Sequence, residues 1–535
     1  MPPKLPQPSP RREIFSPVEP RRRTSIRLLH RRAIVLALSC TLWLPPSGLL
    51  FCGFRLPPSR EASADRRSLG GGWSGGRDAT VPSGKMRCVT TATVPARGGL
   101  QRILGLAFGL AVVVGSTLGV GILRTPGLVA AQLGTPAAIL AVWIAGGLYT
   151  LLGSVCLTEL GTMLPQAGGY YVYARRAFGD TIGFAVGWTD WLTYCAVLGY
   201  ISIGLGEFLA VLVPSAAQIV NVVAVAVLVA LVAIQMAGLR ISSRFQEITT
   251  AIKFVAFLVL VVACFVLSRR VPAAIGAGTL TGGVPPVTLA GVVIALQSVV
   301  ITYGGWQSAL YFTEEDRDPD RNLPRSMIGG VLSVIVVYLL VNVALLAVLP
   351  VATIARSTLP AADAAEALAG VRGRQLITVL SLISLAPLLN AIMMIGTRIL
   401  FAMGRDRLLP ARAAAVNAGG TPVVATLVTT AVAVALIATG TFQRLVAIAA
   451  FLLAVNYFVG CLALIVLRRR EPRLPRSFRA WGYPWTAAIV LVGAAAFLAG
   501  AARGDTVNAG IALGLLVAGM LWRGAMGRRM LNAKC

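Results

Sequence analysis

The amino-acid sequence predicts an all-helical protein that crosses a membrane many times. Hydrophobic residues make up 56% of its 535 residues, charged residues only 13%, and the mean hydropathy is +0.79. Soluble domains carry about 25% charged residues, so this chain has roughly half of the usual solvating charge. Its apolar residues also gather in blocks of about 20, the length that an α-helix needs to cross a ~30 Å hydrocarbon core. A soluble enzyme is therefore excluded.

Twelve apolar blocks follow residue 100, and we expect each of them to form one membrane span. The net charge of +28 is not the mark of a nucleic-acid partner, because the arginines past residue 100 lie mostly in short connections between blocks. With a cytoplasmic N-terminus most of them fall on the inner side, as the positive-inside rule requires. We therefore predict a multi-pass plasma-membrane protein with both termini in the cytoplasm. The predicted spans are 101–127, 133–158, 181–213, 217–238, 247–268, 287–313, 327–350, 374–403, 421–439, 443–467, 483–502 and 506–522.

Composition divides the chain into four regions. Residues 1–98 form a basic tail rich in Pro, Gly and Arg. We expect this tail to be disordered, to hold a cleaved targeting segment, or to come from an over-extended gene model that starts near Met86. Residues 99–467 hold the first ten spans, 468–482 a basic cytoplasmic loop, and 483–535 the last two spans and the C-terminus. The eight scattered cysteines and single histidine indicate no disulfide framework, metal site or cofactor.

Spans 1 and 6 are weak at their centres because glycines interrupt them. Three glycines fall within residues 115–121 of span 1, and Gly304 and Gly305 interrupt span 6. Glycine is about 1 kcal/mol worse than alanine in a helix. Spans 1 and 6 hold the same position, the first, in two five-span halves, about 100–268 and 287–467. Because five is an odd number, the second half must have the inverted orientation in the membrane. Such a pair favours a transporter site at the bilayer midplane; close helix packing is the alternative.

A zwitterion suits a pair of broken helices. Where a helix unwinds in a membrane, its free N–H and C=O groups must find partners in a cavity or on a ligand. A carboxylate can accept from the N–H groups that open the second half-helix, where the helix dipole is positive. An ammonium can donate to the carbonyls that end the first half-helix. An α-amino acid carries both charges on one carbon, so crossed broken helices can hold it with few side chains.

Five segments, taken in order, resemble the motifs of the amino acid–polyamine–organocation (APC) permeases. They are G-S-T-L-G-V-G-I-L at 115–123, P-Q-A-G-G-Y at 165–170, Y-G-G-W at 303–306, the acidic-proline loop 314–325 and the end of span 8 at 396–406. The similarity covers about residues 100–480 and is closest to the L-type amino acid transporter branch and its bacterial relatives. It implies a LeuT-like fold of two inverted five-helix repeats with two extra C-terminal helices, and amino acid transport by alternating access.

The resemblance implies a substrate site at the two breaks. It puts the substrate carboxylate against the backbone of Val120 and Gly121. It puts the ammonium near the carbonyls of Thr117, Ile301 and Gly304. The other residues of this candidate site are Ser116, Gly119, Thr302 and Tyr303. The sequence departs from the family pattern at Val120, where a hydroxyl residue is common, and at Ile301, where an aromatic residue often gates the site.

Lys253 and Asp190 are the candidates for ion coupling, because an ionisable residue inside a span costs on the order of 3 kcal/mol and is functional by default. Lys253 lies seven residues past Gln246 in span 5. The matching lysine of sodium-independent APC members occupies a site where sodium-coupled relatives bind an ion. We therefore expect Lys253 to replace sodium, as a proton carrier or a permanent charge; the alternative is a lysine that extends to the interface. Asp190 in span 3 is either a coupling group or a structural carboxylate near the cytoplasmic interface.

The remaining polar residues of the spans have weaker assignments. We expect Glu159 and Glu207 to be interfacial and Arg398 to pair with an acid of a loop. A position facing the site and a packing role are equally compatible with Asn390, Asn456 and Tyr457.

The resulting hypothesis is a sodium-independent permease for neutral amino acids, working by proton symport or by exchange. No acidic residue falls within the broken segments, which disfavours the alternative of a cationic amino acid or polyamine permease. A membrane enzyme would need a cluster of catalytic side chains, and a non-transporting amino acid sensor is a further alternative. Eukaryotic L-type transporters bind a glycoprotein chain through a cysteine between spans 3 and 4. Residues 214–218 contain none, so we expect no disulfide-linked heavy chain.

Overall fold

The computed structural model describes residues 99–119, 121–267, 287–439 and 442–532, apart from the side chains of residues 439, 442, 443, 504 and 526–532. The predicted tail, 1–98, lies outside these residues. Within them all regular structure is helical, and the β-type pairing is limited to two isolated bridges, Leu104 with Asp316 and Val416 with Pro422.

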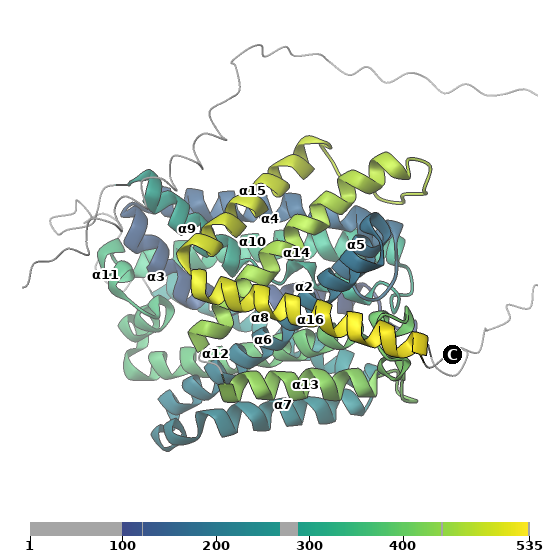
Figure 1. Cartoon of the computed structure of the whole chain (residues 1–535). Helices are drawn as coiled ribbons and strands as arrows, with labels where there is room; N and C mark the ends of the chain where they lie inside the picture. The colour runs from purple at the N-terminus through teal and green to yellow at the C-terminus, as the bar shows by residue number, and fades with distance from the viewer. Residues whose placement is uncertain (1–98, 120, 268–286, 440–441, 533–535) are drawn as a thin grey trace, which may run out of the picture. The chain divides into compact units, whose positions relative to one another are not determined.

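Figure 1 shows the arrangement of the helices. Those before residue 268 are α2 (Leu106–Thr117), α3 (Gly121–Leu133), α4 (Pro136–Met163), α5 (Tyr170–Phe178), α6 (Asp180–Leu212), η1 (Pro214–Ile219), α7 (Val220–Met236) and α8 (Leu239–Leu267). Those after residue 286 are α9 (Leu289–Thr302), η3 (Trp306–Phe312), α10 (Pro319–Val348), α11 (Val351–Arg356), α12 (Pro360–Arg405), η4 (Ala411–Ala414), α13 (Val423–Thr439), α14 (Phe442–Arg470), α15 (Trp485–Gly504) and α16 (Thr506–Asn532).

Proline and threonine set the starts of several spans. Pro136, Pro319 and Pro360 stand in the first turns of α4, α10 and α12, where the missing N–H costs nothing. Thr288 caps α9, since its hydroxyl accepts from the N–H of Gly291 at 3.1 Å. These local signals place the helix starts at or before the beginning of each apolar block.

Each of the twelve predicted segments coincides with a described helix or helix pair. Ten helices of the described residues are long and apolar enough to cross a membrane, and the pair α2 and α3, bent by 43°, makes an eleventh if it is one span. Helix α13, at 17 residues, coincides with the segment predicted at 421–439. The all-helical, multi-pass fold is therefore confirmed, while the full count of twelve spans stays a prediction.

The structure also adds helices that the sequence reading did not predict. α5 fills the connection between the second and third spans, and α11 precedes α12. α12 has 46 residues and begins well before the expected 374, because Gly370 joins two helical segments with φ 65° and ψ −157°. α16 also continues ten residues past the expected end at 522.

Burial distinguishes central from peripheral helices. The apolar stretch of α12 is 72% buried and that of α6 56%, whereas that of α16 is 17% buried. α6 packs against α12 and α14, and α7 and α13 run side by side along the lower edge of Figure 1. The large exposed apolar side chains of α7, α8, α15 and α16 provide the surface that faces lipid.

α4 packs unusually closely against the sixth and seventh spans through glycines. A Cβ atom at Gly146 would lie 2.5 Å from Val299 of α9, and one at Gly161 would lie 2.5 Å from Leu323 of α10. Small residues allow such close backbone approach between membrane helices. The four glycines of α4 that make such contacts are Gly146, Gly147, Gly153 and Gly161.

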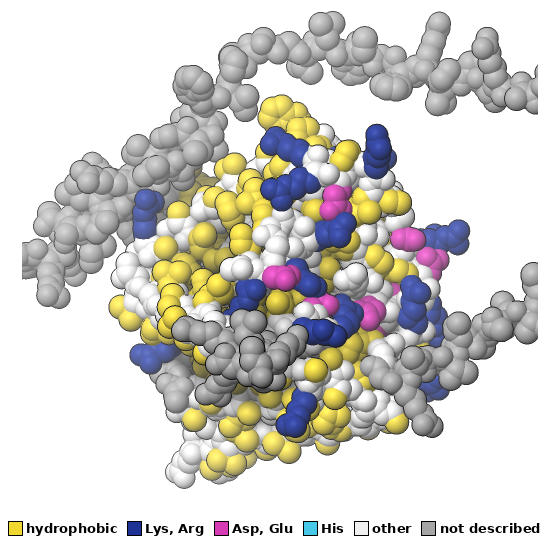
Figure 2. All heavy atoms as spheres, turned by 45° about the vertical axis from the view of Figure 1, so that its right-hand side comes forward, with side chains coloured by type: hydrophobic (Ala, Val, Ile, Leu, Met, Phe, Trp, Pro, Cys, Tyr) yellow, Lys and Arg dark blue, Asp and Glu magenta, His cyan; other side chains and the backbone are white. Residues whose placement is uncertain are grey.

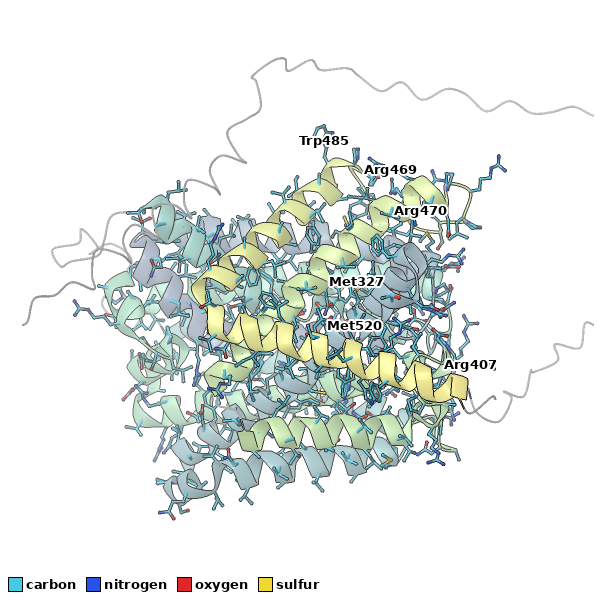
Figure 3. The ribbon with its side chains drawn as sticks, viewed as in Figure 1. Met327, Arg407, Arg469, Arg470, Trp485 and Met520 are labelled. Atoms are coloured by element: carbon cyan, nitrogen blue, oxygen red, sulfur yellow. The ribbon has the colours of Figure 1, made fainter. Side chains whose placement is uncertain are left out.

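Charged side chains gather at one end of the helices. Figure 2, turned to bring that end forward, shows arginines and acidic side chains there among apolar flanks. Arg407, Arg469 and Arg470 lie toward the same end in Figure 3. This is the end at which the sequence predicts the cytoplasmic loops.

Candidate transport site

The first span is broken at its predicted position. α2 ends at Thr117, Leu118 leaves the helical region with φ −72° and ψ 80°, and α3 begins at Gly121. Ser116 and Thr117 turn their hydroxyls back to carbonyls of their own helix, on Val112 at 2.5 Å and Val113 at 2.8 Å. Both hydroxyls thus already have an acceptor within their own helix. Val120 lies outside the described residues.

The sixth span is broken as well, and the two breaks touch. α9 ends at Thr302, and Gly305, with φ 110°, begins the turn into η3. A Cβ atom at Gly305 would lie 2.5 Å from the carbonyl oxygen of Ser116, and one at Gly121 would lie 3.1 Å from the Thr302 methyl. At position 305 only glycine can adopt this left-handed φ and also allow so close an approach of the Ser116 carbonyl. Gly119 likewise belongs to this junction, with its N–H donated to the carbonyl of Thr117 at 2.8 Å.

Several carbonyls at the junction already have donors. The Tyr338 hydroxyl of α10 lies 2.6 Å from the carbonyl of Thr117 and 3.1 Å from that of Thr302. The carbonyl of Ile301 accepts from the N–H of Gly304 at 2.9 Å. A substrate ammonium would therefore have to share or displace these donors, since a carbonyl offers two lone pairs.

Ile301 and its two neighbours lie in different environments. The Ile301 side chain is 51% exposed. The Thr302 hydroxyl lies 2.7 Å from that of Thr125 in α3. Tyr303 is fully buried, with its hydroxyl donating to the carbonyl of Trp143 at 3.3 Å. The place of Ile301 in the substrate site stays a prediction.

Lys253 lies where α8 meets the end of α2. Its side chain is fully buried, and its Nζ donates to the carbonyls of Gly115 and Ser384, both at 2.9 Å. The alternative of a lysine that extends to the interface is therefore wrong. Gln246 and Thr250, on the same face of α8, donate to the carbonyl of Ala111 in α2. The three side chains link α8 to the first half of the broken span.

Asp190 occupies a second polar cluster. It is fully buried, and it accepts from the Tyr311 hydroxyl of η3 at 2.8 Å and from Nδ2 of Asn456 of α14 at 3.1 Å. Asn456 thus contacts the third span. Asn390 instead lies beside α8, where its Nδ2 donates to Oε1 of Gln246 at 3.0 Å.

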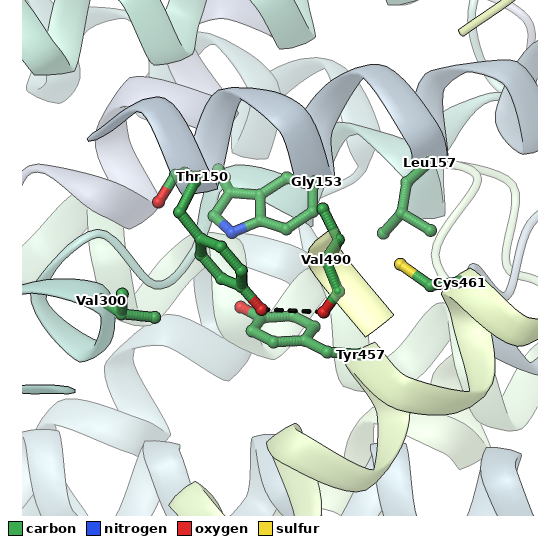
Figure 4. A pocket seen from close by; sticks show the side chains of 9 residues that line it. Thr150, Gly153, Leu157, Val300, Tyr457, Cys461 and Val490 are labelled. Carbon is green, nitrogen blue, oxygen red and sulfur yellow. Dashed lines mark hydrogen bonds between the residues drawn. The ribbon is translucent and has the colours of Figure 1, made fainter. Parts of the chain in front are cut away.

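A small cavity lies next to this cluster. Its volume of about 10 Å³ is room for about one water molecule, so it is too small for an amino acid. Figure 4 shows Tyr457 at its side, with the dashed bond from the Tyr149 hydroxyl to the carbonyl of Val490. The Tyr457 hydroxyl also donates to Oε1 of Gln307 at 3.2 Å. The residues that line the cavity are Tyr149, Thr150, Gly153, Leu157, Val300, Trp306, Tyr457, Cys461 and Val490.

Ion pairs hold the charged end of the helices together. Arg398 pairs with Glu315 through Nε at 3.1 Å and Nη2 at 3.0 Å, which confirms the prediction that Arg398 meets a loop acid. Arg405 pairs with Glu314 at 2.6 Å. Glu159 is fully buried and pairs with Arg468 and Arg476, so it lies at the charged end of the helices without being exposed. Glu207, in contrast, is exposed.

Sequence reasoning missed Tyr338, Ser384 and Gln246. One face of α8 carries Gln246, Thr250 and Lys253, because they are spaced four and three residues apart. This spacing could have been recognised from the sequence alone. Ser384 contributes only its carbonyl, and Tyr338 is one aromatic residue in an apolar span. Neither of those two has a signal in the sequence.

The comparison with known families agrees with this arrangement. The amino acid permease family model matches residues 104–521. The chain belongs to the amino acid permease family. This permease is a multi-pass membrane protein and not an enzyme.

The permease is similar to curated amino acid transporters over most of its length. It is 27% identical over 436 residues to the serine/threonine exchanger SteT of Bacillus subtilis, covering 79% of this chain and 96% of that protein. It is 29% identical to the mouse Asc-type amino acid transporter 1, covering 72% and 73% of the two chains. It is 27% identical to the human large neutral amino acids transporter small subunit 2, covering 71% and 72%.

Proposed function

We propose that this permease moves neutral amino acids across the plasma membrane by alternating access, without sodium and with both termini in the cytoplasm. The names of SteT and of the large neutral amino acid transporter support a neutral substrate. The arginine distribution supports the orientation. The name of SteT favours amino acid exchange as the mode of transport, and proton symport is the alternative.

The contact between the two broken helices is the observation that carries this proposal. The first N–H groups of α3 have no acceptor within the helix, so they can bind the substrate carboxylate near Gly121. The carbonyls that end α2 and α9, at Thr117 and Gly304, are acceptors for the ammonium. Because Tyr338 already bonds the carbonyl of Thr117, the substrate ammonium would compete with its hydroxyl. Backbone groups supply both sites, and segments 115–121 and 301–305 contain no acidic residue that would select a cationic substrate.

We assign Lys253 the role of a fixed cation. Its ammonium already donates to carbonyls of α2 and α12, at Gly115 and Ser384. A sodium ion would need those same carbonyl oxygens, and the ammonium would repel it. Lys253 thereby supplies the charge that links the first broken helix to the eighth span, and transport needs no sodium.

The ion pairs at the charged end form the inner closure in this proposal. Glu315 follows the sixth span and Arg398 lies in the eighth, so their pairing joins two spans of the second five-span half. Release of substrate to the cytoplasm requires that this closure opens. Because η1, between the third and fourth spans, contains no cysteine, the permease is proposed to work without a disulfide-linked heavy chain.

The test is uptake into proteoliposomes that contain the full chain. Labelled serine, threonine, leucine, arginine and putrescine are compared, with and without sodium, in empty vesicles and in vesicles preloaded with unlabelled amino acid. We expect uptake of neutral amino acids that is unaffected by sodium and stimulated by preloading. Uptake of arginine or putrescine alone would favour the cationic alternative. If a folded protein moves none of them, the proposal fails and the alternative of a non-transporting sensor is favoured.

A further inference from the structure

Asp190 is a buried carboxylate bound only by neutral donors. Its two partners are a phenol, Tyr311, and an amide, Asn456. No Lys or Arg of the described residues forms an ion pair with it, whereas the similarly buried Glu315 is paired with Arg398. An ionised carboxylate costs several kcal/mol inside a protein unless another charge compensates it. The site therefore lacks one positive charge.

The titratable side chains that face Asp190 are all phenols. They come from each element packed around it in the described structure: Tyr194 from α6 itself, Tyr311 from η3, Tyr457 from α14 and Tyr170 from α5. None of them supplies a positive charge. The hydroxyl of Tyr170 has no hydrogen-bond partner among the described residues, although the side chain is only 1% exposed. An unpaired buried hydroxyl beside a carboxylate indicates a site built for a further polar species.

The hydrogen bonds around Asp190 all run toward it. Nε2 of Gln307 donates to the Tyr194 hydroxyl at 3.4 Å, Tyr194 donates to Tyr311 at 3.2 Å, and Tyr311 donates to Asp190 at 2.8 Å. This direction suits an ionised carboxylate, which only accepts hydrogen bonds. A protonated Asp190 must donate instead, and each hydroxyl of the chain can reverse because it both donates and accepts.

We propose that Asp190 binds a proton that crosses the membrane with the amino acid, and that the chain Tyr311–Tyr194–Gln307 carries its protonation state to the broken sixth span. Gln307 lies two residues past Gly305 and is therefore at the junction itself. Uptake of one proton from a hydronium ion converts the carboxylate to a neutral acid and reverses the chain. The amide of Gln307 then turns its oxygen toward Tyr194. This inference rests on the proposed function and develops its alternative of proton symport, because it names the coupling ion of the same transporter.

The fold offers the means for this coupling. Asp190 belongs to α6, a central helix, whereas Gln307 and Tyr311 belong to η3. A 3₁₀-helix of seven residues is longer than usual and often marks a functional hinge. A change at Asp190 thus acts on the segment that connects the junction to the inner closure.

The test measures proton flux and exchange in the same proteoliposomes. A pH-sensitive dye trapped inside reports protons that enter with serine, and labelled serine reports exchange. With one proton per substrate, a gradient of one pH unit drives up to about tenfold accumulation. We expect this for the parent protein and for the matched control Glu207→Gln, which removes an exposed carboxylate of the same helix.

Asp190→Asn is expected to keep serine exchange while losing gradient-driven accumulation and the dye signal. Tyr311→Phe, which preserves the carboxylate, is expected to weaken the coupling with exchange retained. If Asp190→Asn fails to fold, infrared spectra of the parent protein and Tyr311→Phe in detergent provide a second readout. A protonated carboxyl band that titrates with pH, and shifts on loss of the Tyr311 hydroxyl, supports the proposal, and its absence overturns it.

The outcomes separate the two levels of inference. Gradient-driven accumulation by Asp190→Asn overturns the proton site and leaves the permease intact. Exchange without proton entry in the parent protein also makes Asp190 merely structural. If the parent protein neither exchanges nor accumulates any amino acid, the proposed function fails and the coupling site with it.

Discussion

Replacing Glu315 by Gln is expected to destabilise the permease strongly, because it leaves a buried arginine without its counter-charge. The Arg398 and Glu315 side chains are 2% and 0% exposed and meet through two bonds at 3.0 and 3.1 Å. Arg398 also donates to the Thr397 hydroxyl at 3.0 Å and lies over the Phe312 ring at 5.5 Å. Removal of one partner from such a pair costs about 3–5 kcal/mol.

The assay is thermal unfolding of purified variants in detergent, arranged as a double-mutant cycle. Glu315→Gln and Arg398→Met are each expected to be much less stable than the parent. The double variant is expected to recover part of the loss, because neither charge is then left unpaired. The control is Glu366→Gln, which breaks an ion pair with Arg374 that is about half exposed and should cost less than about 1 kcal/mol.

Additive losses in the double variant would refute this reasoning, because they would mean that the two side chains do not stabilise each other. A loss for Glu366→Gln as large as that for Glu315→Gln would also contradict it, since burial would then have no effect on the cost.

Three further predictions concern the junction. Lys253→Met should lower stability by about 2 kcal/mol or more, because two buried carbonyls lose their donor, and should abolish serine exchange; the exposed Arg244→Met on the same helix should leave both unchanged. Gly305→Ala should abolish transport, since its Cβ would lie 2.5 Å from a carbonyl oxygen at a φ that costs about 1–2 kcal/mol; normal uptake would contradict the close contact of the two breaks. Tyr338→Phe should lower the KM for serine by up to about fivefold, because a competing donor worth about 1 kcal/mol is removed from the carbonyl of Thr117; a higher KM would mean that Tyr338 helps to bind substrate.

The sequence predicted the features that depend on local composition. Apolar length predicted the helices, and glycine content predicted both breaks, because a helix without side-chain support unwinds where propensity is lowest. For Lys253 the sequence left two alternatives open, a cation that replaces sodium and a lysine that extends to the interface. Each of these features depends on only a few residues that are neighbours in the sequence.

The features that the sequence reading missed depend on long-range packing. The contact of Thr302 with Thr125 of α3 joins residues that are 177 positions apart, and no local pattern contains it. The burial of Glu159 depends on Arg468 and Arg476, more than 300 residues away along the chain. Helix α5 is short and amphipathic, so its apolar pattern was too brief to separate it from a loop.

The glycines of α4 have a mechanical consequence. Side chains of α9 and α10 that fit against these glycines cannot slide along α4 without a clash, so α4 should move as one body with α9 and α10. Labels placed on α4 and α10 should then keep a constant separation through the transport cycle, while the distance from α4 to α12 changes. A small rotation of α4, the second span, would therefore be transmitted to both halves of the broken sixth span, through Val299 of α9 and Trp306 of η3.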